Sequence, residues 1–172
     1  MRVAVTGTPG TGKTTATEKL AADPEFPLDV IHLNEVIREE GFTTGRDDQR
    51  ESLVADLGAV ADWLDGRAEV LFESHLAHNF EADRVVVLRC HPETVEQRLR
   101  ERGEPEESAV ENAESEALDV ILAEAVERHG EDRVYEVDTT DLTPEEVAAE
   151  VGAVVAGDRE PGAGAVSFLD YL

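Results

Sequence analysis

The chain has 172 residues, 41% of them hydrophobic, which is enough to bury the core of one globular domain. Its 40 acidic residues outnumber 15 basic ones, giving a formal net charge of −25; this excludes strong electrostatic binding of nucleic acid and better suits a basic protein partner. No apolar run is long enough to span a membrane, and the first predicted strand leaves no room for a signal peptide. The single Cys90 can form no internal disulfide, so we expect a cytoplasmic protein.

The acidic charge also predicts a salt-rich cytosol. Only two lysines, Lys13 and Lys19, are present in the whole chain. The self-repulsion of so many carboxylates would weaken a compact fold in dilute buffer, whereas molar salt screens it within about 3 Å. We therefore expect a halophilic protein, with an ordinary acidic protein as the alternative.

A phosphate-binding loop follows the first predicted strand, at residues 2–6. Residues 7–14 fit the pattern G-x-x-x-x-G-K-[ST], and a predicted helix at 14–22 comes next. Glycines allow a tight turn with inward N–H groups, and the start of the helix favours a polyphosphate. Lys13 would reach the β- and γ-phosphates, and Thr14 would ligate Mg²⁺. The expected contacts to ATP in this loop are Gly10, Gly12, Lys13, Thr14 and Thr15.

Apolar runs and helical patterns alternate along the rest of the chain. Four further strands are predicted at residues 28–33, 69–73, 84–89 and 134–137. Helices are predicted at residues 34–40, 51–64, 92–102 and 106–129, with a last one starting at 143. Asn34 is the expected cap of the first of these helices and Gly41 its end, and Thr143 and Glu146 have capping-box spacing. Residues 42–50 are predicted to form a polar loop.

This alternation predicts an α/β fold of the P-loop NTPase type, with a five-stranded parallel sheet and helices on both faces. The continuous apolar run at 84–89 agrees, because both faces of such a strand are buried. The domain is expected to span residues 1–156. Residues 157–172 are predicted to form a flexible tail, whose apolar end at 166–172 either packs on the body or offers a docking peptide.

An acid and a histidine follow the third predicted strand, in Glu73-Ser74-His75. The carboxyl edge of an open α/β sheet faces the ligand, so Glu73 is expected to hold Mg²⁺, directly or through water. His75 is expected to titrate near neutrality and to position or relay a proton. The structural alternative is a strand-end acid and histidine that face solvent. We expect His78 at the surface and His32 to be structural or exposed.

Three arginines are candidates for phosphate contacts. Arg38 lies in the predicted helix at 34–40, where a second phosphate-bearing substrate would lie, and Arg98 and Arg102 flank the helix end before Gly103. Guanidinium groups there can clamp phosphates and neutralise charge that builds up during transfer. The alternative is surface ion pairing, which is common in so acidic a chain. A GTPase is disfavoured because the chain has no Asn-Lys pair.

These motifs together resemble one family, the atypical adenylate kinases of the isoenzyme six type, also described as coilin-interacting nuclear ATPases and small-subunit ribosome maturation factors. The charge suits a halophilic archaeal member. The resemblance runs from about residue 2 to 155 and is carried by residues 7–15, 36–40, 98–103 and 111–114. Two departures stand out. The family's Asp-x-His motif is Glu73-Ser74-His75 here, and the expected aromatic and lysine residues after Gly103 are replaced by residues 104–107, Glu-Pro-Glu-Glu.

The resemblance implies a nucleoside monophosphate kinase, with the fold of that class. The enzyme would mainly convert ATP and AMP to two ADP, accept a broad range of monophosphates and use Mg²⁺. It would also have intrinsic ATPase activity. Lys13, Glu73 and His75 would be the catalytic groups, Arg102 a contact to ATP and Arg38 a contact to the monophosphate. A flap at about 33–55 and a short lid at about 102–112 would close over the substrates. The resemblance also implies an ATP-switched role in small ribosomal subunit maturation and rRNA processing, through transient binding of a ribosomal protein of the S-eleven type.

Overall fold

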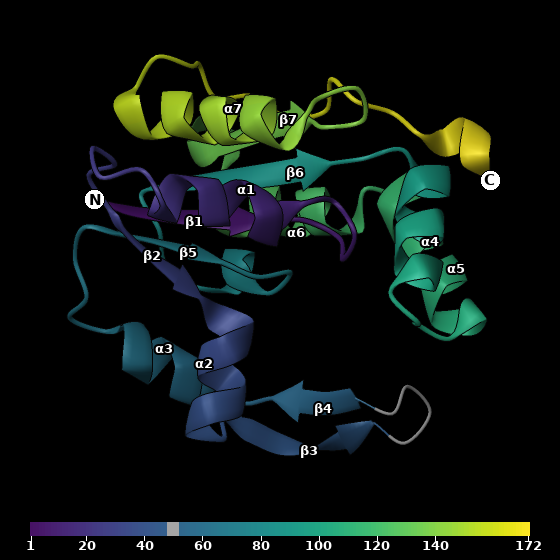
Figure 1. Ribbon diagram of the computed structural model, residues 1–172, viewed down its shortest axis with the longest axis horizontal. Helices are drawn as coiled ribbons and strands as arrows, with labels where there is room; N and C mark the ends of the chain where they lie inside the picture. The colour runs from purple at the N-terminus through teal and green to yellow at the C-terminus, as the bar shows by residue number, and fades with distance from the viewer. Residues whose placement is uncertain (48–51) are drawn as a thin grey trace.

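The computed structural model describes residues 1–47 and 52–172 and contains a five-stranded parallel sheet in the order β2-β5-β1-β6-β7 (Figure 1). All five predicted strands are confirmed to within one residue at each end. Their bounds are Arg2–Thr6 for β1, Asp29–His32 for β2, Val70–Glu73 for β5, Arg84–Arg89 for β6 and Val134–Asp138 for β7. The predicted α/β fold class is therefore correct.

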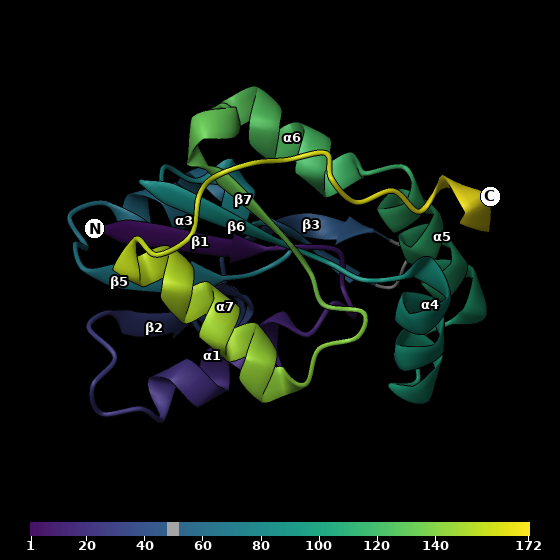
Figure 2. The same cartoon turned by 90° about the horizontal axis from the view of Figure 1, so that it is seen from above.

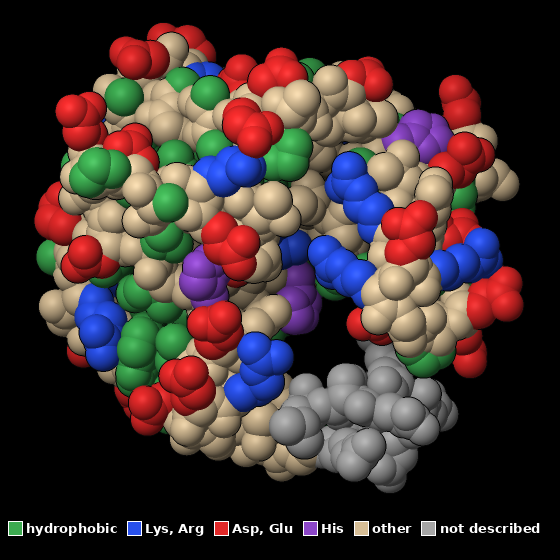
Figure 3. Space-filling model, in the orientation of Figure 1, with side chains coloured by type: hydrophobic (Ala, Val, Ile, Leu, Met, Phe, Trp, Pro, Cys, Tyr) green, Lys and Arg blue, Asp and Glu red, His purple; other side chains and the backbone are tan. Residues whose placement is uncertain are grey.

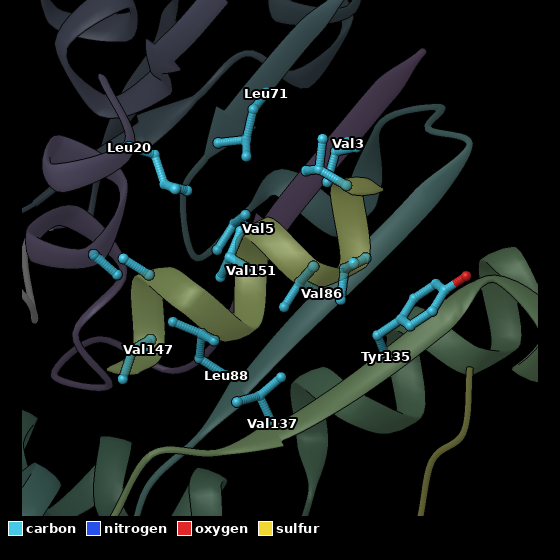
Figure 4. Packing of buried hydrophobic residues seen from close by; sticks show 14 of the residues in the cluster. Val3, Val5, Leu20, Leu71, Val86, Leu88, Tyr135, Val137, Val147 and Val151 are labelled. Atoms are coloured by element: carbon cyan, nitrogen blue, oxygen red, sulfur yellow. The ribbon is translucent and has the colours of Figure 1, made fainter. Parts of the chain in front are cut away.

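Helices cover both faces of the sheet, because successive side chains of each strand point to opposite sides. Val3 and Val5 pack beneath α1 (Lys13–Ala21) and α7 (Pro144–Ala156), as Figure 4 shows. Ala4, between them, faces the opposite core, formed with α2 (Leu33–Glu40), α3 (Leu57–Leu64) and α6 (Val120–His129). Figure 2 shows α7 and α6 on opposite sides of β6 and β7. No helix in the described ranges is long and apolar enough to cross a membrane.

A β-hairpin replaces the polar loop expected after Gly41. Strand β3 (Thr43–Asp47) pairs antiparallel with β4 (Ser52–Ala55), so the loop prediction is wrong for 43–47. The helix expected from residue 51 is wrong in its first part, since α3 begins only at Leu57, where the Asp56 carboxylate accepts from the Ala59 N–H at 3.1 Å. The parts of both predictions that fall on residues 48–51 lie outside the described residues.

Two of the predicted helix signals are confirmed and one is wrong. Gly41 ends α2 with φ of 69°, and Thr143 and Glu146 form the predicted capping box of α7. Asn34 is not the cap of α2, because the helix already begins at Leu33 with His32 at the cap position. The Asn34 side chain instead accepts a hydrogen bond from the Ser74 hydroxyl at 2.8 Å, which ties α2 to the end of β5.

The long helix expected at 106–129 is broken into α5 (Glu106–Ala117) and α6. Asp119, between them, has a left-handed φ of 56°. A buried arginine from β6 explains the break: Arg89 Nη2 donates to the Glu116 carbonyl at 3.1 Å and to Asp119 Oδ1 at 2.5 Å. Arg89 thus binds polar groups at the C-terminal end of α5, where the helix stops. The preceding helix, α4 (Pro92–Glu101), ends before Gly103 as predicted.

The C-terminal residues after α7 run along β7 and end beside α4, at the right of Figure 1. Gly162 donates its N–H to the Val134 carbonyl at 2.8 Å and accepts from the Glu136 N–H at 3.1 Å. Phe168 is 9% exposed and meets the His91 ring edge-on at 5.4 Å, and the Tyr171 hydroxyl donates to Glu96 at 2.7 Å. Of the two roles open for residues 166–172, the structure shows packing on the body.

Candidate active site

The phosphate-binding loop joins the end of β1 to the start of α1, and glycine is required at both ends of it. A Cβ at Gly7 would lie 2.6 Å from the Leu88 carbonyl oxygen of β6, so no other residue fits there without moving the strand. Gly12 has φ of 93° and forms the cap of α1. Its left-handed backbone turns the chain into the helix, which leaves the first N–H groups of α1 facing the loop.

Lys13 is folded back into this loop. Its Nζ donates to the carbonyls of Gly7 at 2.8 Å and Thr8 at 3.1 Å, and only 8% of the residue is exposed. Burial lowers the pKa of Lys13 to about 8, an effect that the Glu73 carboxylate opposes and the Arg102 guanidinium reinforces. The ammonium group is therefore still mainly charged at pH 7 and lies where an incoming phosphate would meet it.

Glu73 faces the start of α1 from the end of β5. The Thr14 hydroxyl donates to Glu73 Oε1 at 3.2 Å, and His32 Nδ1 lies 2.8 Å from the same oxygen. A hydroxyl and a buried carboxylate are oxygen ligands of the kind that Mg²⁺ prefers. Residues 1–47 and 52–172 hold no cluster of three His, Cys, Asp or Glu suited to a metal. This donor set fits Mg²⁺, which takes its remaining ligands from phosphates and water.

His32 is a site residue that sequence reasoning missed. It was expected to be structural or exposed, yet it is paired in register with Glu73 on the neighbouring strand. Because the two residues are 41 positions apart, only the order of strands in the sheet brings them together.

His75 lies at the same edge but does not titrate near neutrality, so that expectation is wrong. Burial, reinforced by the positive charge of Lys13, lowers the pKa of His75 to about 4. The ring is therefore neutral at pH 7 and can donate or accept a hydrogen bond without carrying charge.

We expected His78 at the surface, and that prediction is wrong. It is buried between β1 and α6, with Nδ1 2.8 Å from the Thr6 hydroxyl and Nε2 2.7 Å from Glu124 Oε2. Burial also lowers the pKa of His78. Its contacts connect the last residue of β1, immediately before the phosphate loop, to α6.

The three candidate arginines occupy different places around the loop. Arg98 Nη1 donates to the Gly10 carbonyl at 2.9 Å, so this side chain supports the loop from α4. Arg102 is exposed and lines the cavity above the loop. Arg38 is exposed on α2 and lines a neighbouring cavity.

Three adjoining cavities form one groove along this edge of the sheet. The central cavity, about 250 Å³, is lined by Gly10, Gly12, Lys13, Thr14, Glu73, His75 and Arg102, among others. It shares Gly10, Gly12 and Arg102 with a cavity of about 260 Å³ that also contains Thr15. On its other side it shares Asn34, His75 and Glu104 with a cavity of about 690 Å³ that contains Arg38. Figure 3 shows the hollow between the body and α4–α5, bordered by several Lys and Arg side chains.

A buried carboxylate, Glu116 of α5, holds the loop from below and was not recognised in the sequence. Glu116 accepts from the Thr8 hydroxyl at 2.6 Å, from Arg89 Nε at 2.8 Å and from the Cys90 N–H at 3.1 Å. Arg89 also donates to Glu136 of β7 at 2.7 Å. Nothing in the sequence singles out Glu116 among so many acids, since Thr8 lies 108 positions away.

This fold and site define a P-loop nucleotide-binding protein with the architecture of the small kinases. Among the solved structures that share the fold are two shikimate kinases. The shikimate kinase from Acinetobacter baumannii in complex with shikimate has a TM-score of 0.61 at 18% identity, over 92% of this chain and 94% of that one. The shikimate kinase from Bacteroides thetaiotaomicron has a TM-score of 0.61 at 17% identity, over 91% and 98%.

Sequence comparisons give the family. The profile of a family described as "AAA domain" matches residues 3–119. A protein from Natronomonas pharaonis named "Putative adenylate kinase" is 60% identical over the whole of both chains. Proteins of the same name are 57% identical in Halobacterium salinarum, over all of both chains, and 45% identical in Methanothermobacter thermautotrophicus, over 99% of this chain and 98% of that one. The chain belongs to this adenylate kinase-like family; its assignment to the isoenzyme six type stays a prediction.

Proposed function

We propose that the protein transfers the γ-phosphoryl group of ATP to a nucleoside monophosphate, with AMP as the main acceptor and two ADP as products. The observation that carries this proposal is the groove, in which the cavity above the phosphate loop opens into a further cavity on each side. Two nucleotides that meet phosphate to phosphate need that arrangement, whereas hydrolysis needs only one nucleotide site. The relatives named as adenylate kinases support the same class of reaction.

The smaller side cavity suits the nucleoside of ATP. Its walls combine the apolar side chains of Leu142, Pro144 and Val147 with Arg98 of α4 and Arg102, the residue that follows this helix. An aromatic base gains from apolar contact and from a guanidinium near its face. The triphosphate would then run over Gly10 and Gly12 to Lys13, where N–H groups and the ammonium face it.

The larger side cavity suits the monophosphate. Arg38 supplies a guanidinium for the phosphate, and Ile37, Val54 and Leu57 supply apolar wall. Asn34 and His75 line both this cavity and the central one, so they lie between the two expected phosphates. The hairpin β3–β4 and α2 belong to the predicted flap at 33–55, which we propose closes over this substrate.

Transfer would depend on position and charge, without a covalent intermediate. Thr14 and Glu73 would hold Mg²⁺, Glu73 directly or through water, and the metal would neutralise phosphate charge when bound. Lys13 and Arg102 would share the negative charge that develops on the transferred group. His75, neutral at pH 7, would orient the acceptor phosphate by a hydrogen bond. Closure of the predicted lid at 102–112 would exclude the water that otherwise leads to ATP hydrolysis.

The test is ADP formation from ATP in high KCl, with and without AMP. We expect AMP to accelerate ADP formation strongly in the wild type. Arg38→Ala should lose the AMP-dependent part and keep slow hydrolysis, because Arg38 lies only in the larger cavity. Lys19→Ala is the matched control, since Lys19 pairs with Glu145 and lines a different cavity from those of the groove. Equal losses of both activities in Arg38→Ala would contradict its acceptor-side role, and AMP-indifferent turnover in the wild type would contradict kinase function.

A second candidate function is an ATP-switched assembly factor for the small ribosomal subunit. The net charge of −25 favours it, since a basic ribosomal protein of the S-eleven type would be attracted to such a surface. This function predicts slow ATP hydrolysis that is indifferent to AMP and accelerated by that ribosomal protein. The assay above therefore separates the two functions.

A further inference from the structure

A cavity lined by three arginines lies at the opposite edge of the sheet from the phosphate loop. It measures about 460 Å³ and is lined by Arg2, Arg128, His129 and Arg133, together with Glu81 and Asp83. Arg2 is the first residue of β1 and the phosphate loop follows its last, so the strand separates the two sites by about 13 Å at 3.3 Å per residue. In Figure 2 the N-terminus lies at the end of the molecule away from α4 and α5.

Within the described part of the chain, the arginines that line this cavity have neither a carboxylate partner nor a hydrogen-bond acceptor, a property that Arg38 and Arg102 of the nucleotide groove share. Among residues 1–47 and 52–172, the side chains of Arg2, Arg128 and Arg133 form no ion pair or hydrogen bond. The Nε of Arg2 is buried without any hydrogen-bond partner. In a chain with 40 acidic residues, three guanidinium groups left unpaired around one cavity indicate donors reserved for an external anion.

The other groups on the cavity wall are already partly engaged. Asp83 accepts the backbone N–H of Arg2 at 2.7 Å, and the guanidinium of Arg2 lies 5.6 Å from the centre of the Phe72 ring, which holds it in place. The Nε2 of His129 donates to the His78 carbonyl at 2.8 Å. Glu81 is exposed and can remain in water when the cavity is filled.

We propose that this cavity binds a small multivalent phosphate, at a site separate from the nucleotide groove. One guanidinium group can donate two parallel hydrogen bonds to the oxygens of a phosphate. Three guanidinium groups can therefore surround two linked phosphates. The cavity is larger than one phosphate needs, and Ala82 is its only apolar lining residue among those described, so the ligand is polar and has no base to stack.

The experiment is a calorimetric titration of the full chain with inorganic pyrophosphate. It uses Lys13→Gln protein, so that the phosphate loop contributes little. We expect one equivalent to bind, and Arg128→Gln or Arg133→Gln added to that protein to weaken binding about tenfold each, the loss of one charge-assisted contact. Both residues are exposed, so the fold should survive. Lys19→Gln removes one positive charge elsewhere and should leave the affinity unchanged.

Four results would overturn the proposal. The first is no binding up to about 10 mM pyrophosphate, which corresponds to a negligible affinity. The second is unchanged affinity in the Arg128→Gln, Arg133→Gln double variant. The third is complete displacement of pyrophosphate by ATP, which would place the anion on the phosphate loop. The fourth is equal binding of malonate, which would show that the cavity does not distinguish phosphates from carboxylates.

Discussion

The Glu116→Gln substitution should lower the free energy of unfolding by about 2–3 kcal/mol, although it keeps the size of the side chain. Glu116 is 3% exposed and accepts hydrogen bonds from Thr8, Arg89 and Cys90. Two of these hydrogen bonds should weaken when the carboxylate charge is removed: the one from the Arg89 guanidinium at 2.8 Å and the one from the Thr8 hydroxyl at 2.6 Å.

The magnitude follows from the change in those two bonds. A hydrogen bond to a charged group contributes about 1.5–3 kcal/mol, and a neutral one about 0.5–1.5 kcal/mol. A glutamine can turn its oxygen toward Arg89 and Cys90, while the Thr8 hydroxyl rotates to accept from the amide. The Thr8 bond then joins two neutral groups and the Arg89 bond loses its anionic acceptor, which costs about 1–1.5 kcal/mol in each. The Arg89 guanidinium is not left without a carboxylate partner, because it still pairs with Glu136 and Asp119.

The assay is urea unfolding at a fixed, high KCl concentration. Glu114→Gln is the matched control, because Glu114 is exposed on the same helix and its loss removes the same charge. A double-mutant cycle with Thr8→Val isolates the contact between α5 and the phosphate loop, and we expect a coupling energy of at least about 0.5 kcal/mol. The reasoning fails if Glu116→Gln is no more destabilising than Glu114→Gln.

Three further predictions concern pH, the C-terminal segment and salt. The pKa of His75 is about 4 in the folded protein and 6.5 in the unfolded chain, so the unfolded chain binds the proton more tightly. The contribution of His75 to the free energy of unfolding, at most about 3 kcal/mol, is therefore fully present above pH 6.5 and is lost as the pH falls toward 4. Denaturant unfolding at several pH values should show this slope in the wild type and not in His75→Gln. Phe168→Ala should cost about 3 kcal/mol in thermal unfolding, whereas Leu169→Ala, at a position 57% exposed, should cost little; equal effects would mean that the ring does not anchor this segment. A circular dichroism titration with KCl should show loss of structure in dilute buffer, and a fold intact without salt would contradict the halophilic interpretation.

Much of the fold could be predicted because its signals are local. Apolar runs placed all five strands of the large sheet, since β1, β5, β6 and β7 are buried on both faces and the edge strand β2 is partly buried. The phosphate loop was recognisable because Gly7 and Gly12 meet backbone requirements that only glycine satisfies. The capping box at Thr143 is equally local, with both partners within one turn.

The errors fall where distant residues override local preference. The apolar spacing at 53–64 fits a helix, yet pairing with β3 makes residues 52–55 a strand. Residues 106–129 favour one helix, yet Arg89 from β6 breaks it at Asp119. Charges and burial acting together also place the pKa of His75 at about 4, a value that no spacing in the sequence reveals.

By itself the sequence determined the α/β class and the phosphate loop, because those depend on residues that are neighbours along the chain. Only the tertiary structure decided that His32 joins Glu73, that Glu116 lies beneath Thr8, and that cavities adjoin the phosphate loop on both sides. The physical reason is the parallel sheet. It brings together strand ends far apart in sequence, and a carboxylate at such an edge acquires its role from partners that only the order of the strands supplies.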